Sequence, residues 1–173
     1  MRDSSQPASH LPGLSSDEVF VWFGFNLVHA SIVRHLDVTL RAAHGLPLSD
    51  CEILLWISRP SCHHLRLAAL ADLVRLSPSG LSRAIERLES RGLVHRLRAE
   101  EDGRGAFAEL TPAGASLTAQ VATTIAETVR TEMLAVMTPE EMATFRQVWR
   151  RLLAHDSQSF PITHIMIEEE TPQ

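Results

Sequence analysis

Lysine and tyrosine are both absent from this 173-residue chain, and all sixteen of its basic residues are arginine. We attribute that bias to a GC-rich genome rather than to chemistry. Cysteine is scarce, since Cys51 and Cys62 are the only two and no CxxC pair occurs. Two cysteines exclude a disulfide framework of the kind that holds small secreted domains together. With 45% hydrophobic residues the chain can still form a core, which excludes wholesale disorder.

Long apolar runs are missing as well. The stretch MRDSSQPASHLPG at 1–13 lacks the apolar core of a signal peptide. The most apolar run, VFVWFGF at 19–25, is too short to span a bilayer before Asn26, His29 and Arg34 interrupt it. We therefore expect a soluble, cytoplasmic protein.

The sequence patterns of common enzyme and metal sites are also lacking. No GxSxG, HExxH, P-loop or GxGxxG pattern occurs, and the acidic residues are scattered. His29 and His35 do not share a helix face, and the CHH run at 62–64 has no second clustered pair of ligands. We expect neither catalysis, nor a metal, nor a cofactor.

The chain is acidic overall but basic in one segment. Its formal net charge is −5, which argues against a protein that coats nucleic acid without specificity. Residues 77–99, however, hold five arginines against two acidic residues. A local basic surface of this kind suits docking to an anion, and charge alone fits a solvated helix face equally well.

Capping patterns mark the first two helices. Ser15 with Glu18 forms an S-x-x-E capping box that opens a long apolar helix over about 17–44. That helix is apolar around much of its circumference, so we expect burial on two of its faces. A second S-x-x-E box begins at Ser49 and predicts a short helix that ends near residue 57.

The segment SPSGLSRAIERLESRG at 77–92 carries the start and stop signals of one short helix. Ser77 can cap its amino end, Pro78 suits the first helical position, and Gly92 can end it. Another short amphipathic helix, LRLAALADLVRL, precedes it. Helical spacing divides the segment into an apolar and a polar face, with Leu81, Ala84, Ile85 and Leu88 opposite Ser79, Arg83, Glu86 and Ser90.

The only β-like stretch follows this helix. Segments 93–100 and 106–111 flank EDGRG, a turn rich in Gly and Asp, and together they predict a hairpin. Thr111 then caps a long helix that continues to about residue 137, and a capping box at Thr138 opens the last helix.

The predicted order is a long helix, three short helices, a hairpin and two long helices. Three short helices with a two-stranded hairpin describe a winged helix-turn-helix, in which 77–92 is the second helix of the pair. The expected fold is mainly α with a small β-hairpin wing, flanked by long dimerisation helices at both ends. The expected segments are a flexible amino-terminal arm, a dimerisation helix, the winged DNA-binding domain, two further dimerisation helices and a tail, at 1–16, 17–46, 47–111, 112–155 and 156–173.

The stretch LADLVRLSPSGLSRAIERLESRGLVHRLRAEEDGRGAFAELTPAGASL at 70–117 resembles transcriptional regulators of the MarR (multiple-antibiotic-resistance regulator) family. The helix-turn-helix, the wing residues Asp102 and Arg104, and the LTPAG motif at 110–114 carry the resemblance. Together with the long flanking helices it covers about 17–155. Many members carry Asp-Arg-Arg at the wing, whereas this chain has Asp-Gly-Arg-Gly and keeps a single cation at the tip.

The resemblance implies a homodimer that binds a pseudo-palindromic operator in double-stranded DNA. The terminal helices of both chains would form the dimer body. A small molecule, often a phenolic compound or another aromatic acid, would release the DNA, and repression is the family's commoner mode. The family's usual effector pocket lies between the first long helix and the wing domain, but no sequence motif marks it.

The residues of 77–92 themselves suit the reading of DNA. A major groove ~12 Å wide admits one helix, and bidentate pairing with guanine suits the guanidinium of Arg83. Arg87 is predicted to contact phosphate, and N–H groups near Ser79 and Gly80 to anchor another phosphate. The alternative is an exposed polar face on which Glu86 pairs with Arg83. The predicted DNA-binding residues are Ser77, Ser79, Gly80, Ser82, Arg83, Arg87, Arg96, Arg98, Asp102 and Arg104.

Arg104 would reach the minor groove with Asp102 bracing it, unless the turn is merely solvated. Arg96 and Arg98 point to one strand face, which meets either phosphates or water. The residues predicted to line an effector pocket are Trp22, His29, Arg34 and Trp56, because a cation beside aromatic walls suits an aromatic carboxylate. Each of these four could instead be plain core or surface.

Two other functions stay open. One is a regulator of the same fold that senses a metal or an oxidant, for which Cys51 is predicted to be buried and Cys62 to be exposed without a resolving partner. The other is a helical interaction protein that has lost DNA binding, against which the arginines at 83, 87 and 104 argue.

Overall fold

The computed structural model describes residues 11–59, 66–98 and 106–155, and these form six α-helices, a short 3₁₀ helix and a two-stranded sheet. The elements in chain order are α1 (Ser16–His44), α2 (Leu48–Ile57), α3 (Leu67–Leu73), α4 (Pro78–Ser90), β1 (Val94–Arg98), β2 (Ala106–Leu110), α5 (Pro112–Glu132), η2 (Leu134–Val136) and α6 (Pro139–His155). The predicted fold class and element order are confirmed. The predicted continuation of the penultimate helix to residue 137 breaks at Met133 into η2.

The capping box at the start of α1 is formed as predicted. The Glu18 N–H donates to Ser15 Oγ at 3.3 Å, and the Ser15 N–H donates to Glu18 Oε2 at 2.7 Å. At the other end Gly45 adopts a left-handed conformation with φ 66°, and its N–H donates to the carbonyl oxygen of Arg41. These contacts satisfy backbone groups that a helix end otherwise leaves unpaired. A reciprocal pair of the same kind, between Thr138 and Glu141, opens α6.

The capping box predicted at Ser49 is wrong. Helix α2 begins at Leu48, two residues earlier than a cap at Ser49 requires, and its N-cap residue Pro47 makes no side-chain cap. Instead the Leu48 N–H donates to Asp37 Oδ1 at 2.9 Å, and Arg41 Nε holds the other carboxylate oxygen at 2.7 Å. These two hydrogen bonds keep the pKa of Asp37 below its usual value. The cap comes from α1 rather than from local sequence, because the short link after Gly45 brings the start of α2 beside α1.

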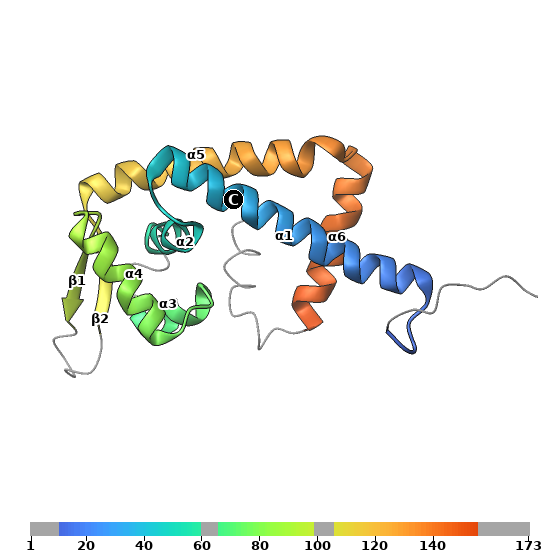
Figure 1. The fold of residues 1–173 in the computed structure, drawn as a ribbon, viewed down its shortest axis with the longest axis horizontal. Coiled ribbons are helices and arrows are strands. Elements are labelled where there is room, and N and C mark those ends of the chain that lie inside the picture. The colour runs from blue at the N-terminus through green and yellow to red at the C-terminus, as the bar shows by residue number, and fades with distance from the viewer. Residues whose placement is uncertain (1–10, 60–65, 99–105, 156–173) are drawn as a thin grey trace, which may run out of the picture.

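The hydrophobic core lies in the winged-helix end of the molecule. Figure 1 shows α2, α3, α4 and the hairpin gathered there, with α5 leaving from β2 and running beside α1. The strands pair antiparallel, with Val94 opposite Leu110. The first turn of α5 approaches the start of β1 so closely that Thr111 N–H and Oγ1 donate to the carbonyl oxygens of Leu93 and Gly92, respectively. This close approach fixes the wing against the long helix.

The long helices extend beyond that core and leave much apolar surface uncovered. On α1 only Leu36 and Leu40 are buried, and on α6 no described residue is. The α6 helix packs on α1 through the rings of Phe25 and Trp149, whose centroids lie 5.6 Å apart. The larger apolar side chains left exposed on α1 and α6 are Phe20, Val21, Trp22, Phe23, Phe25, Leu27, Val28, Val33, Val38, Met142, Phe145 and Leu152.

Helix α1 is also the one described helix whose length and composition would let it cross a membrane, with a mean hydropathy of 1.3 over its best 18-residue window. The expectation that Asn26, His29 and Arg34 break the apolar run too early was therefore too strict. An average over 18 residues tolerates isolated polar side chains. The carboxy-terminal half of α1 packs against α2 and α5, as a core helix does.

Candidate nucleic-acid interface

Helix α4 has one buried and one exposed face, as its spacing predicts. Leu81, Ala84, Ile85 and Leu88 are at most 2% exposed, whereas Ser79, Arg83 and Glu86 face solvent. The start and stop signals are confirmed, since Ser77 is the N-cap, Pro78 is the first helical residue and Gly92 has φ 68°. The core thus anchors α4 by its apolar stripe and presents a polar face outward.

One backbone N–H at the amino end of α4 is already hydrogen-bonded to a side chain of the same turn. The Gly80 N–H donates to Ser77 Oγ at 3.1 Å, so this N–H is not free to anchor a phosphate as predicted. The two hydroxyls of Ser77 and Ser79 lie 3.2 Å apart. Ser77 and Gly80 therefore build the helix end, and the exposed Ser79 is the residue of this turn best placed to meet a ligand.

Arg83 stays exposed in the middle of the polar face. Its Nε donates to the carbonyl oxygen of Ser79 at 3.3 Å, so its stem lies along the first turn of α4. Glu86 does not pair with it, since Glu86 Oε1 accepts from Ser82 Oγ at 3.2 Å instead. The predicted alternative of an Arg83–Glu86 pair is thus absent from the described structure, and Arg83 is not neutralised by a carboxylate.

Arg87 differs from Arg83 because it is paired with a buried acid. Its Nε and Nη2 donate to Asp50 Oδ2 and Oδ1 of α2 at 3.1 and 2.7 Å, respectively. The Asp50 side chain is only 1% exposed, while that of Arg87 is 53% exposed. The hydrogen bonds that Arg87 donates to this carboxylate raise the pKa of Arg87 above its usual value.

Asp50 and Arg91 are two residues that sequence reasoning missed. Arg91 Nη1 donates to the carbonyl oxygen of Gly45 at 2.8 Å, and Nη2 donates to that of His44 at 3.1 Å. A signal for Asp50 was present, because it precedes the buried Ile53 and Leu54 by three and four residues and so shares their helix face. No local signal marks Arg91, since its partners lie 46 and 47 residues away.

The described part of the wing is the paired body of the hairpin. Arg96 is exposed on β1, and its N–H donates to Glu89 Oε1 of α4 at 3.2 Å. Arg98 pairs with Ala106 in the ladder. The predicted wing-tip residues Asp102 and Arg104 lie outside the described residues.

Of the two cysteines, Cys51 is buried as predicted and Cys62 lies outside the described residues. Burial and the neighbouring Asp50 raise the pKa of the Cys51 thiol to about 12. Since the thiolate is the reactive form, Cys51 is nearly all thiol at neutral pH and a poor nucleophile.

We therefore expect Cys51 to resist iodoacetamide in the native protein at pH 7.5. Mass spectrometry of the peptide that contains it should show labelling only after unfolding in guanidinium chloride. Rapid modification of Cys51 in the folded chain would contradict this burial and would revive the oxidant-sensing alternative.

The four residues predicted for an effector pocket do not come together. Trp22 and Arg34 are twelve residues apart on α1, about 18 Å along a helix. His29 stacks on Phe25 with ring centroids 6.0 Å apart, and Trp56 carries the Arg59 guanidinium 4.5 Å above its ring. Only Arg34 lines a described cavity.

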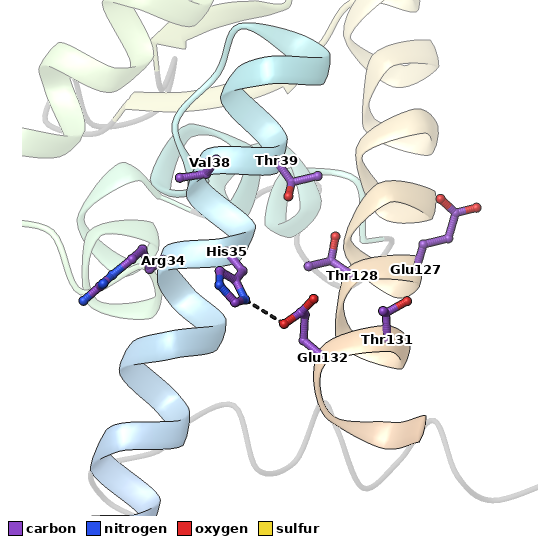
Figure 2. A pocket seen from close by; sticks show the side chains of 8 residues that line it. All are labelled: Arg34, His35, Val38, Thr39, Glu127, Thr128, Thr131 and Glu132. Atoms are coloured by element: carbon purple, nitrogen blue, oxygen red, sulfur yellow. Dashed lines mark hydrogen bonds and ion pairs between the residues drawn. The ribbon is translucent and has the colours of Figure 1, made fainter. Parts of the chain in front are cut away.

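That cavity lies between α1 and α5 and has a volume of about 420 Å³. Figure 2 shows His35 of α1 and Glu132 of α5 pointing toward one another, with their Nδ1 and Oε2 atoms 2.7 Å apart. Arg34 lies on its α1 side and extends away from α5. The lining side chains are Arg34, His35, Val38, Thr39, Glu127, Thr128, Thr131 and Glu132, so no aromatic wall is among them.

None of the four predicted residues lines the second described cavity, about 570 Å³ between α2, β2 and α5. Within 11–59, 66–98 and 106–155, no group of three or more His, Cys, Asp or Glu side chains could hold a metal ion. The CHH run at 62–64 lies outside those ranges.

Comparison with known proteins supports a winged helix-turn-helix with long flanking helices. Residues 44–105 match the family model described as MarR family. AbsC, a MarR family transcriptional regulator from Streptomyces coelicolor, is 29% identical with a TM-score of 0.74, over 84% of this chain and 97% of its own. Sco3205, another such regulator from the same organism, solved in complex with DNA, is 28% identical with a TM-score of 0.73, over 83% of this chain and 89% of its own.

Wild-type MarR from E. coli in its apo form shares the fold at 22% identity, with a TM-score of 0.66, over 77% of this chain and 96% of its own. No curated protein matches the sequence significantly. The family match spans the helix-turn-helix and the start of the wing, and the solved regulators match the long helices as well. Residues 44–105 are therefore similar to the MarR family, and the chain has the fold of the solved winged-helix transcriptional regulators of that family.

Proposed function

We propose that this chain binds a pseudo-palindromic operator as a homodimer, represses transcription there, and releases the DNA when a small effector binds. The observation that carries the proposal is the exposed face of α4, where Ser79 and Arg83 lie opposite a fully buried apolar stripe and Arg83 pairs with no carboxylate of the described residues. A helix anchored in this way can enter the major groove with its first turns against base edges. The DNA complex of Sco3205 supports the same assignment.

Arg83 is the residue proposed to read a base. An Arg83→Ala chain should bind its preferred duplex at least about 10- to 100-fold more weakly and should lose discrimination at one base pair in each half-site, since each bidentate guanine contact contributes about 1–3 kcal/mol. The preferred duplex is one selected from a random pool, and fluorescence anisotropy measures the affinity. Arg130→Ala, which removes an exposed arginine from α5, is the matched control and should bind like the parent.

An Arg83→Ala chain that keeps both affinity and sequence preference would contradict the reading role. Selection of no duplex by the wild-type chain at low ionic strength would refute DNA binding itself. That second result would favour the alternative of a helical interaction protein.

The homodimer is proposed from the apolar surface of the long helices. Side chains of α1 such as Phe20 and Leu27 are 79% and 71% exposed, respectively, in the single chain. Contiguous apolar surface of this extent on a soluble protein marks an interaction site. A second copy offers the same surface, as a two-fold interface requires. The two copies would then hold their α4 helices one turn of the duplex apart, roughly 34 Å.

The effector is proposed to bind in the cavity between α1 and α5. Its volume of about 420 Å³ falls in the usual range for small-molecule sites. Arg34 on the α1 side would offer a cation to a carboxylate after its side chain turns toward α5, while Thr39 and Thr128 offer hydroxyls. Trp22, His29 and Trp56 lie elsewhere, so we retain only Arg34 of the residues first expected.

Salicylate is a suitable probe of this site. We expect millimolar salicylate to raise the melting temperature of the wild-type chain and to weaken its DNA binding, and to do neither with Arg34→Gln. Phenol, which lacks the carboxylate, is the control ligand and should act weakly on both proteins. Equal responses of both chains to salicylate would place the effector elsewhere.

We propose a cytoplasmic location, where an operator is accessible. The apolar length of α1 is then explained by the dimer interface rather than by a bilayer. Recovery of the expressed chain in the membrane pellet, resistant to high salt, would contradict this placement.

A further inference from the structure

Two arginines on the last turns of α4 do not project freely as Arg83 does. Arg87 is bound to Asp50 of α2, and Arg91 is bound to the carboxy-terminal end of α1. We propose that Arg87 and Arg91 are positioning residues, which fix the angle of α4 against the long helices and thereby set the spacing at which the dimer reads its two half-sites. The inference rests on the proposed function, and it removes Arg87 from the set of phosphate contacts.

Arg87 and Asp50 form a bidentate salt bridge. Two nitrogen atoms of one guanidinium meet both oxygens of one carboxylate, which fixes the orientation of both groups. Because the charges cancel, the pair offers a phosphate little net attraction. Because Asp50 is 1% exposed, its charge also depends on Arg87 for compensation, so α4 cannot move from α2 without leaving a buried carboxylate unpaired.

Arg91 forms the second attachment, one turn further along α4. Its two terminal nitrogens donate to the carbonyl oxygens of His44 and Gly45 at 3.1 and 2.8 Å. These carbonyls lie at the carboxy-terminal end of α1, where unpaired backbone oxygens favour a cation. Arg91 therefore caps α1 and ties α4 to it with the same side chain.

The attachment continues from α1 to α5. His44 Nε2 lies 2.9 Å from Thr124 Oγ1 of α5, so the end of α1 that Arg91 caps is itself joined to the second long helix. In the proposed dimer α1 contributes to the interface. Two side-chain contacts then fix the orientation of α4 relative to the dimer body, in addition to the buried apolar stripe that anchors α4 in the core.

Arg83 shows the contrast on the same helix. Within the described residues its side chain hydrogen-bonds only to the Ser79 carbonyl oxygen of α4 itself, so no polar bond ties Arg83 to another described element. Successive arginines of α4 thus divide into one that faces outward and two that face the scaffold. A loss of either scaffold contact should let α4 tilt, which widens the range of half-site separations that the dimer accepts.

The experiment compares operator spacing in three proteins. The wild-type chain, Arg91→Gln and the double variant Asp50→Asn/Arg87→Gln are titrated with a duplex selected by the wild type from a random pool, and with duplexes that have one base pair added or removed between half-sites. The double variant removes both charges, so no buried charge is left unpaired. Arg91→Gln alters an exposed side chain and keeps the test valid if the double variant fails to fold, which circular dichroism shows.

We expect the wild type to prefer the selected spacing strongly, and each variant to lose about tenfold of that preference, comparable to one good contact. The slope of log affinity against log salt should stay unchanged, because no phosphate contact is lost. A slope that falls by about one for each chain of the dimer, with spacing preference intact, would make these residues phosphate contacts and overturn the inference. Spacing preference equal to that of the wild type in Arg91→Gln would also overturn it. Failure of the wild type to select any duplex would instead refute the proposed function, and this inference with it.

Discussion

A Gly114→Ala chain is expected to melt about 10 °C below the wild type, which corresponds to a loss of about 3 kcal/mol for a protein of this size. A Cβ atom at this position would lie 1.9 Å from the carbonyl oxygen of Leu93 and 2.9 Å from its carbonyl carbon. Both are backbone atoms, so no side-chain rotation can relieve the contact. The first turn of α5 would have to move away from β1.

The same turn of α5 also makes the hydrogen bonds from Thr111 to the carbonyl oxygens of Leu93 and Gly92, so moving it would strain these bonds as well. Thermal unfolding by circular dichroism measures the loss. Ala113→Gly, an exposed change in the same turn, is the control and should cost less than about 1 kcal/mol. A Gly114→Ala chain as stable as the parent would show that α5 and β1 are less closely packed than described.

Acidic substitutions on the amino-terminal half of α1 are expected to dissociate the protein into single chains. Phe20 and Leu27 are 79% and 71% exposed, so Phe20→Glu/Leu27→Glu removes little buried surface among the described residues of one chain. In the proposed dimer the same change places carboxylates in an apolar interface, where uncompensated charge is costly. The folded monomer should survive while the dimer does not.

The consequence for DNA binding should be larger than that of any single α4 substitution. A monomer contacts one half-site and loses the effective concentration that links two reading helices, so affinity should fall by about 100-fold or more. Sedimentation equilibrium and anisotropy measure the two effects. Leu97→Glu, which changes a 40% exposed leucine on β1, is the control for oligomeric state and should remain dimeric. A dimeric Phe20→Glu/Leu27→Glu chain would place the interface elsewhere.

The helices whose start and stop signals lie in the local sequence could be predicted, and α4 shows why. Ser77, Pro78 and Gly92 each act within a few residues, so the local chain alone determines where the helix starts and stops. The apolar stripe of α4 follows from spacing in the same way. The order of three short helices and a hairpin then predicted one winged domain, and the resemblance to MarR-type regulators implied that it binds an operator as a homodimer.

The tertiary contacts could not be predicted, because their partners are distant in sequence. The cap of α2 comes from Asp37 on the preceding helix, and Arg87 meets Asp50 across 37 residues. An arginine on an exposed helix face has the same local pattern whether it meets a phosphate or a buried acid. Trp22 and Trp56 line neither of the two cavities described above, because the aromatic character of a side chain does not determine which cavity it lines.

The most direct test of the whole account is the stoichiometry and footprint of the complex with a selected duplex. Native mass spectrometry combined with hydroxyl-radical footprinting should find two chains on each duplex and two protected half-sites, about 10 base pairs between their centres. A single chain on the duplex, a footprint without two-fold symmetry, or no complex at low ionic strength would contradict it.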